Sequence, residues 1–286
     1  MKELRLPKIA ALTAARNDTF FLTRWIRYYG RILGGSEHLY ILLDGTEQLP
    51  PPNVASAHVR NIEHLALSRS EGELRRLTLL SQWAQELFAA GYDVVLGCDA
   101  DEYLVPDPAL HLTLPQLIAP YWQKYPALSA LGLDMGQRLG SEPPLQENQS
   151  ILAQRAYGVL SGRYSKPALM CRPNLTWGRG FHRIKGHNYH ILPGLYLIHL
   201  GYCDEGILHQ RLGDRSRNPA WQKHIHKQGR TIRYATHRKP LPGDRFLPLA
   251  RRLQTFCRPP YAWNKPIMPC RGILIQLPER FRQIDL

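Results

Sequence analysis

The sequence lacks a long apolar run and has few cysteines. No uninterrupted stretch approaches the roughly 18 residues that a membrane-spanning helix needs, so we expect no transmembrane segment. The first apolar stretch, 9–15, is too short for a signal peptide and ends in Arg-Asn-Asp, so we interpret it as a buried strand of a cytoplasmic protein. The five cysteines are odd in number and never spaced as Cys-x-x-Cys, which argues against a disulfide framework and a structural zinc site.

Acidic residues are scarce in the second half of the chain. Residues 151–286 contain 24 Lys and Arg but 6 Asp and Glu, whereas residues 1–150 contain 13 and 17. The basic half favours an anionic partner: the phosphates of a donor, the inner face of a cell membrane, or nucleic acid. Nucleic acid is the least favoured, because the aromatic residues are not interleaved with basic ones and no known binding motif is present.

Strand and helix patterns alternate along the first 135 residues. We predict strands at 8–14, 38–43, 57–62, 93–98 and 127–133, and helices at 20–29, 71–90 and 114–125. This order predicts an α/β fold with a mixed, mostly parallel open sheet flanked by helices. Beyond a loop at 136–150 we predict strands at 166–171 and 195–200 and helices at 204–212 and 219–228, with no assignment from Lys239 onward. The expected organisation is a core of residues 1–200 and a basic, mostly helical region of residues 201–286.

The most informative motif is Asp99-Ala100-Asp101, which directly follows the apolar strand 93–98. Ligands of open α/β sheets bind beyond the carboxyl ends of strands, and residues two apart in an extended chain point to the same side. Two carboxylates suit Mg²⁺ or Mn²⁺ shared with substrate phosphates. Asp-x-Asp also occurs by chance in turns and caps, but a second acidic strand end at Asp44 favours a functional site.

Three segments together resemble the glycosyltransferases of family 2 and the family 92-like proteins, which have the GT-A fold. The segments are Ala15-Arg16-Asn17-Asp18 with the aromatic helix after it, Leu42-Leu43-Asp44-Gly45, and Asp99-Ala100-Asp101-Glu102-Tyr103-Leu104. The resemblance covers most of residues 8–200, with the nucleotide-sugar half at about 1–135. It implies metal-dependent transfer of a sugar from a nucleotide-diphosphate donor, a UDP-sugar, to a glycan or lipid-linked acceptor.

The resemblance also implies roles for single residues. Arg16, Asn17 and Asp44 would contact the nucleobase and ribose. Asp99 and Asp101 would meet the ribose and the metal-bound diphosphate, and Glu102 would orient them. Local roles in a helix cap and a turn explain Arg16, Asn17 and Asp44 equally well.

The basic half contributes three further candidates. Lys166 is a candidate phosphate ligand, although a solvated basic face is an alternative. A histidine from this part of such proteins often completes the metal shell, and His182 and His199 both qualify. The sequence does not choose between them, and a structural hydrogen bond is the commoner role for either one alone.

The catalytic base is less well defined. An inverting transferase needs a carboxylate that deprotonates the acceptor hydroxyl. Asp134 ends the strand 128–133 and is our candidate, with Glu142 and Glu147 on the following loop as alternatives. Inversion and retention both remain open. Two other functions are considered: a nucleic-acid-binding protein, and a metal-dependent phosphoesterase, which would need more converging carboxylates and histidines.

Overall fold

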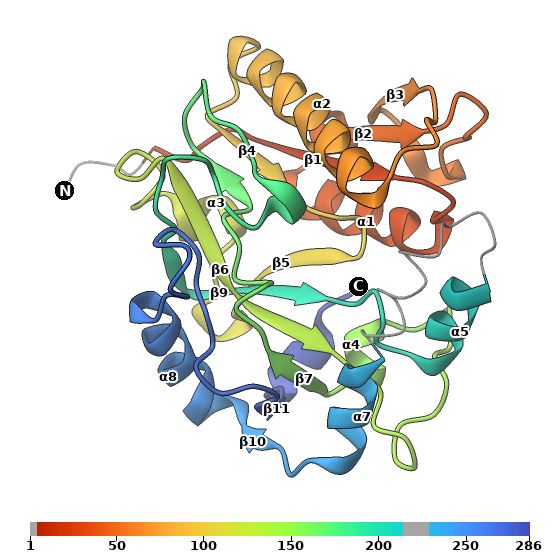
Figure 1. Ribbon diagram of the computed structural model, residues 1–286, viewed down its shortest axis with the longest axis vertical. Coiled ribbons are helices and arrows are strands. Elements are labelled where there is room, and N and C mark those ends of the chain that lie inside the picture. Colours follow the sequence, from red (N-terminus) through yellow and green to blue (C-terminus); the bar gives the residue numbers. More distant parts are fainter. Residues whose placement is uncertain (1–4, 214–228) are drawn as a thin grey trace.

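The computed structural model describes residues 5–213 and 229–286 (Figure 1). Within these residues an 11-stranded mixed sheet runs in the order β10-β11-β7-β6-β8-β4-β1-β2-β3, and β5 and β9 pair off this path. Helices lie against both faces of the N-terminal part of the sheet, so the predicted α/β fold with a mixed open sheet is confirmed. The helix predicted at 219–228 lies outside the described residues.

Four parallel strands form the N-terminal half of the sheet: β1 (Ile9–Ala15), β2 (Leu39–Asp44), β3 (His58–Ile62) and β4 (Val94–Gly97). Helix α1 (Thr19–Leu33) packs on one face, where Ile9 and Ala11 meet Trp25. Helix α2 (Arg69–Ala89) packs on the other, where Ala10 and Leu12 meet Trp83. Because both faces are covered, β1 and β4 do not alternate, and apart from Thr13 neither strand carries a polar side chain. Their carboxyl ends all point to one edge.

The helix ends follow local sequence signals. Helix α2 begins after Ser68, whose side chain forms a capping box with Glu71, and the chain leaves it through Gly91 at φ 87°. The helix predicted at 114–125 is shorter than expected: α3 spans Leu114–Ile118. Pro120 follows two residues later, and its ring and missing N–H disfavour continuation of the helix.

Strands β5 (Glu102–Pro106), β6 (Ala127–Met135) and β9 (Ile191–His199) form the centre of the molecule. Strand β5, which the sequence did not predict, runs antiparallel to β9, and β9 runs parallel to β6. The strand predicted at 166–171 is reduced to β8 (Leu169–Met170), which bridges β4 and β6.

The C-terminal residues contribute strands to the same sheet as residues 1–200. Both sides of the boundary predicted at residue 200 therefore share one sheet. Strand β11 pairs antiparallel with β7, and β10 pairs with β11. The remaining elements are α4 (Ile151–Gln154), β7 (Tyr157–Leu160), α5 (Glu205–Gly213), α7 (Arg230–His237), β10 (Leu241–Pro242), α8 (Gly243–Phe256) and β11 (Leu274–Gln276). Five 3₁₀ turns are described: η1 (Ser36–His38), η2 (Pro52–Val54), η3 (Pro108–Leu110), η4 (Arg179–Phe181) and η5 (Glu279–Gln283).

One ion pair ties the C-terminus to the centre of the sheet. Arg280 binds both carboxylate oxygens of Asp107, at 2.5 and 2.9 Å, directly after β5. Burial opposes ionisation of Asp107, but its hydrogen bonds to Arg280 and to the Ala109 amide hold its pKa below the ordinary value. Among the described helices, none combines the length and apolarity that crossing a bilayer demands.

Candidate active site

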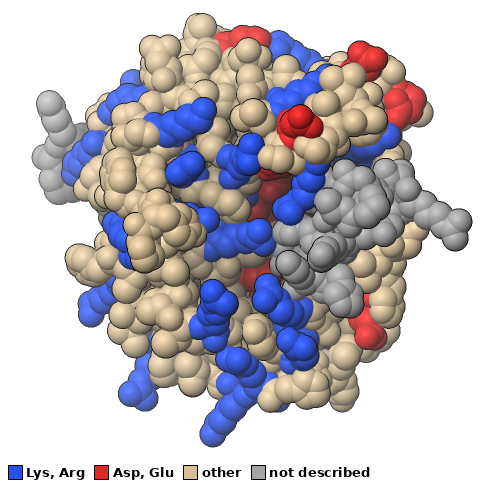
Figure 2. All heavy atoms as spheres, viewed as in Figure 1, with Lys and Arg blue, Asp and Glu red and all other residues tan. Residues whose placement is uncertain are grey.

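A pocket of about 930 Å³ opens beyond the carboxyl ends of β1, β2 and β4. Figure 2 shows acidic side chains recessed in this face of the molecule, with Lys and Arg around them. The pocket is lined by most of the residues that the sequence analysis selected: Arg16, Asn17, Asp44, Asp99, Asp101, Glu102, Lys166, His182 and His199. Asp134 and its alternatives Glu142 and Glu147 are not part of the lining.

The ends of β1 and β2 form one wall. The Arg16 guanidinium donates to the Asp44 backbone carbonyl at 2.6 Å, and Asn17 exchanges two hydrogen bonds with Gln48, at 3.0 and 2.8 Å. Asn17 adopts φ 50°, a left-handed conformation that Asn tolerates better than most residues. The Asp44 carboxylate lies 2.9 Å from the His64 ring. These contacts fix the loops that bound the pocket and leave the Asp44 side chain at its edge.

Helix α1 holds the acidic turn after β4. The Tyr29 hydroxyl donates to the Glu102 carbonyl at 3.1 Å and accepts from the Leu104 amide at 2.9 Å. The Tyr28 hydroxyl donates to the Leu104 carbonyl at 2.8 Å. The aromatic helix that formed part of the sequence resemblance therefore fixes the backbone directly after Asp101.

Asp99 lies between two cations. Its Oδ1 is 2.5 Å from the Arg76 guanidinium, and its Oδ2 is 3.4 Å from Lys166 Nζ. Burial favours the neutral acid, but the charges of Arg76 and Lys166 outweigh it and hold the pKa of Asp99 below its ordinary value. Asp99 is therefore an ionised carboxylate whose charge is already balanced by the protein.

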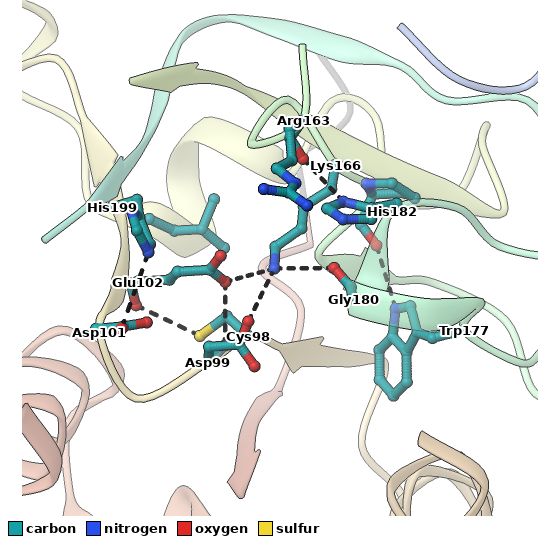
Figure 3. Close-up of polar contacts among 12 residues, drawn as sticks. Cys98, Asp99, Asp101, Glu102, Arg163, Lys166, Trp177, Gly180, His182 and His199 are labelled. Atoms are coloured by element: carbon teal, nitrogen blue, oxygen red, sulfur yellow. Dashed lines mark hydrogen bonds and ion pairs between the residues drawn. The ribbon is translucent and has the colours of Figure 1, made fainter. Parts of the chain in front are cut away.

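Lys166 and Glu102 form a buried pair beside Asp99 (Figure 3). The two charged atoms are 2.6 Å apart, and each side chain is 1% exposed. Lys166 also donates to the Gly180 carbonyl at 3.1 Å, while Glu102 accepts from the Asp99 amide at 3.0 Å. Burial and the neighbouring carboxylate of Asp99 raise the pKa of Glu102 to about 7, against the effect of Lys166. The hydrogen bond from the Asp99 amide to the Glu102 carboxylate closes the turn between these two residues.

Asp101, His199 and Asp134 form a chain that leads from the pocket into the core. The His199 Nε2 atom lies 3.8 Å from Asp101 Oδ2, and its Nδ1 lies 2.6 Å from Asp134 Oδ1. The other oxygen of Asp134 accepts from the Thr231 hydroxyl at 2.6 Å. Burial alone would lower the pKa of His199, but the carboxylates of Asp101 and Asp134 raise it above its ordinary value.

This placement corrects the expectation that Asp134 reaches the crevice. Strands β6 and β9 align Asp134 with His199 in register, so the Asp134 carboxylate faces the histidine and not the pocket. Both of its oxygens are engaged. A carboxylate on Nδ1 fixes the ring and its tautomer, so Asp134 is placed as a positioning residue for His199.

The two candidate histidines lie in different surroundings (Figure 3). His199 faces Asp101, whereas the His182 ring bonds the Arg163 carbonyl at 2.9 Å. Burial, together with the charge of Lys166, lowers the pKa of His182 well below its ordinary value, so this ring is neutral. Because its Nε2 atom faces Asp101 Oδ2, His199 is the better placed of the two for a shared metal site with Asp101.

Arg211, from α5, occupies the space next to Asp101. It donates to Asp101 Oδ2 at 2.9 Å and to Asp18 Oδ2 at 2.7 Å, and its guanidinium lies over the rings of Phe21 and Tyr202. Asp18 is the N-cap residue of α1, but its side chain makes no capping hydrogen bond. The Asp18 side chain instead holds a pocket cation.

A divalent cation fits this donor set only in part. Among the described residues, no group of three or more His, Cys, Asp or Glu side chains is arranged to hold a metal ion. Asp101 and His199 supply one oxygen and one nitrogen that face each other. Mg²⁺ and Mn²⁺ accept such an incomplete protein set when substrate phosphates fill the remaining positions. The residues present therefore fit a cation shared with a diphosphate, not a site closed by the protein alone.

Among the pocket cations that were not selected from the sequence are Arg76, Arg163, Arg179 and Arg211. Arg76 had one local signal, because Glu73 lies one helical turn before it and pairs with it at 3.0 Å. The others stand on loops or on a helix that reaches the pocket only through the tertiary fold. Charge alone could not separate them from the other basic residues of this half.

No family model matches the sequence, and a search of curated proteins finds no match. Among solved structures, the chain is similar to mannosyltransferase PcManGT from Pyrobaculum calidifontis in complex with GDP-Man and Mn²⁺, with 10% identity, a TM-score of 0.37, and coverage of 78% of this chain and 69% of that one. For S. aureus TarS 1–349 the values are 10%, 0.33, 80% and 71%. For mannose-1-phosphate geranyltransferase from Thermus thermophilus they are 11%, 0.30, 77% and 64%. At these TM-scores the overlap is loose, and we base the proposed function on the site itself.

Proposed function

We propose that the protein is a metal-dependent glycosyltransferase that moves a sugar from a nucleotide-diphosphate donor, a UDP-sugar, to a glycan or lipid-linked acceptor. The observation that carries this is a pocket at the carboxyl ends of parallel strands with carboxylates on its floor and cations along its walls. A nucleoside diphosphate needs this combination: carboxylates for the ribose hydroxyls and a shared cation, and guanidinium or ammonium groups for the phosphates. The motif resemblance of residues 8–200 supports the same reaction.

The pocket residues divide between the two parts of the donor. Arg16, Asn17 and Asp44 lie at the wall formed by β1 and β2, where we place the nucleobase and ribose. Asp101 and His199 would hold Mn²⁺ or Mg²⁺, which supplies positive charge to the leaving diphosphate. Asp99 remains a donor ligand in this proposal, and the contacts of Arg76 and Lys166 set its charge.

Further pocket cations complete the proposal. Arg163 and Arg179 also line the pocket, and Lys166 lies 3.4 Å from Asp99. Preorganised cations stabilise the charge that develops on a departing diphosphate. We assign the role of catalytic base to no residue, because the Asp134 carboxylate is turned toward His199.

Titration calorimetry with UDP tests the proposal. The wild type should bind UDP more tightly with Mn²⁺ than without it, and Asp101→Asn should lose that metal-dependent gain. The matched control is Asp93→Asn, because Asp93 lies at the opposite end of β4 and pairs with Arg5 at 2.7 Å, away from the pocket.

Three results would contradict the proposal. A UDP affinity that changes neither with Mn²⁺ nor in Asp101→Asn would rule out the proposed metal site. Failure to bind UDP, combined with DNA or RNA binding that weakens steeply with salt, would favour a nucleic-acid-binding protein. Release of phosphate from simple esters without transfer to an acceptor would favour a phosphoesterase.

A further inference from the structure

Helix α8 exposes an apolar and basic face on the outside of the molecule. Its inner face is buried through Leu247, Ala250 and Gln254, whereas the outward positions carry large side chains. The outward residues recur every three or four positions, as one helical face requires: Arg245, Leu249, Arg252, Leu253 and Phe256. Phe256 is 81% exposed, which is unusual for a phenylalanine at the end of a well-packed helix.

The loop after α8 continues this surface with exposed aromatic residues. Tyr261 is 77% exposed and Trp263 is 60% exposed, and Ile267 is also exposed. The loop is not loosely attached: Arg258 Nε donates to the Trp263 carbonyl at 2.7 Å, and the Ile267 amide donates to the Cys257 carbonyl at 3.3 Å. The exposed rings are therefore presented by a fixed backbone. We call the outward face of α8 together with residues 257–268 the α8 surface.

The charge of the α8 surface is predominantly positive. Residues 245–268 contain five Lys and Arg and no Asp or Glu, and the one acidic residue of α8, Asp244 in its first turn, pairs with Arg280. Apolar and aromatic side chains flanked by basic residues are typical of surfaces that lie in the interface of an anionic bilayer. Tyrosine and tryptophan suit that depth, because one end of each ring system is apolar and the other is polar.

We propose that the α8 surface docks the protein on an anionic phospholipid bilayer. Leu249, Leu253 and Phe256 would enter the acyl boundary, with Tyr261 and Trp263 at the level of the headgroups. The basic residues of the surface would contact the lipid phosphates. Because the residues are exposed, docking needs no change in the fold.

The α8 surface lies next to two segments that line the pocket, which connects docking with the proposed reaction. A side chain added at Gly162 would meet Pro266 and Ile267, so the loop of the α8 surface packs against the segment that carries Arg163 and Lys166. Asn264 donates to the Ile184 carbonyl at 3.2 Å, close to the segment that carries His182. Both segments form pocket wall. Given the proposed glycosyl transfer, a lipid-linked acceptor in the same bilayer would be held beside the pocket.

Vesicle flotation of the full chain tests the docking. The wild type should float with vesicles of phosphatidylcholine mixed with phosphatidylglycerol, and not with phosphatidylcholine alone. The double variant Phe256→Ser with Trp263→Ser should lose about 100-fold in partition, because each buried ring contributes about tenfold. The double variant Arg245→Gln with Arg252→Gln should lose about 25-fold, since each cation near the surface contributes about fivefold.

Two single-site controls make the same kinds of change elsewhere, an exposed apolar side chain to serine and an exposed cation to glutamine. Leu49→Ser alters a side chain that is 85% exposed in the segment after β2, which Figure 1 shows on the opposite side of the molecule from α8. Lys124→Gln removes an exposed cation after α3. Both variants should float like the wild type. UDP titration of every variant separates this proposal from the proposed function, because the α8 surface lies outside the pocket.

Several outcomes would overturn the docking. Equal flotation with neutral and anionic vesicles, or with neither, would reject an anionic bilayer as the partner. Equal weakening in the two controls would show that the α8 surface is not specific. Sedimentation that finds a wild-type dimer and a monomeric Phe256→Ser with Trp263→Ser variant would identify a second copy of the chain as the occupant. RNA binding that is lost in the same variants would identify a nucleic acid.

Discussion

Replacement of Lys166 by methionine isolates the buried charge network beneath the pocket. Methionine is similar in length and volume, so the change removes the charge and leaves little cavity. It also leaves Glu102, which is 1% exposed, without the ammonium group that now lies 2.6 Å away. Asp99 keeps Arg76, so the loss falls mainly on Glu102.

The expected cost follows from this geometry. Loss of one partner of a buried ion pair destabilises a protein by about 3–5 kcal/mol, because the remaining charge is buried without compensation. Burial already raises the pKa of Glu102 to about 7, and without Lys166 that pKa rises further. A carboxyl whose folded pKa exceeds its unfolded value, about 4.3, favours the folded state below that value and loses this contribution as pH rises through the folded pKa. The deficit of Lys166→Met should therefore shrink as the pH is lowered from about 8 to about 5.5.

Urea unfolding of four proteins measures the effect: wild type, Lys166→Met, Glu102→Gln and the double variant. Because the double variant has no unpaired buried charge, its loss should be smaller than the sum of the single losses by about 2 kcal/mol. Additive losses, or an unchanged Lys166→Met midpoint accompanied by weaker UDP binding, would refute the reasoning. The second result would identify Lys166 as a phosphate ligand with no structural share.

Three further predictions concern other contacts. Asp134→Asn should weaken Mn²⁺-dependent UDP binding by about 10–100-fold through loss of the orienting bond to His199, whereas slower turnover with unchanged Mn²⁺ binding would restore Asp134 as the base. Arg211→Met should raise the affinity for Mn²⁺ alone by about tenfold, because it frees the Asp101 carboxylate of a neighbouring positive charge; an unchanged calorimetric affinity would contradict this. Asp107→Asn should lower the free energy of unfolding by about 2–4 kcal/mol. Since the folded pKa of Asp107 is depressed, the wild-type advantage should hold above about pH 4 and disappear as the pH falls through the folded pKa, and an advantage that is independent of pH in urea unfolding would contradict the assignment.

Local sequence signals were sufficient for the four parallel strands of the N-terminal half of the sheet. Apolar runs predicted β1, β2 and β4. Helices cover both faces of these strands, so their sequences are nearly continuous hydrophobic runs that are easy to recognise. The Ser68–Glu71 box and Gly91 set the ends of α2. The C-terminal third had no such clarity: β11 has three residues and depends on β7 for its hydrogen bonds, so nothing local indicates it.

The amino-acid sequence by itself determined where the acidic residues stand, because strands that run in parallel bring Asp44, Asp99 and Asp101 to one edge of the sheet. Only the tertiary structure decided what surrounds them. Arg211 reaches Asp101 from 110 positions along the chain, and the alignment of β6 with β9 turned Asp134 from the pocket toward His199. A strand end follows from periodicity within a few residues, whereas the partner of a buried charge follows from packing between distant segments, which periodicity does not contain.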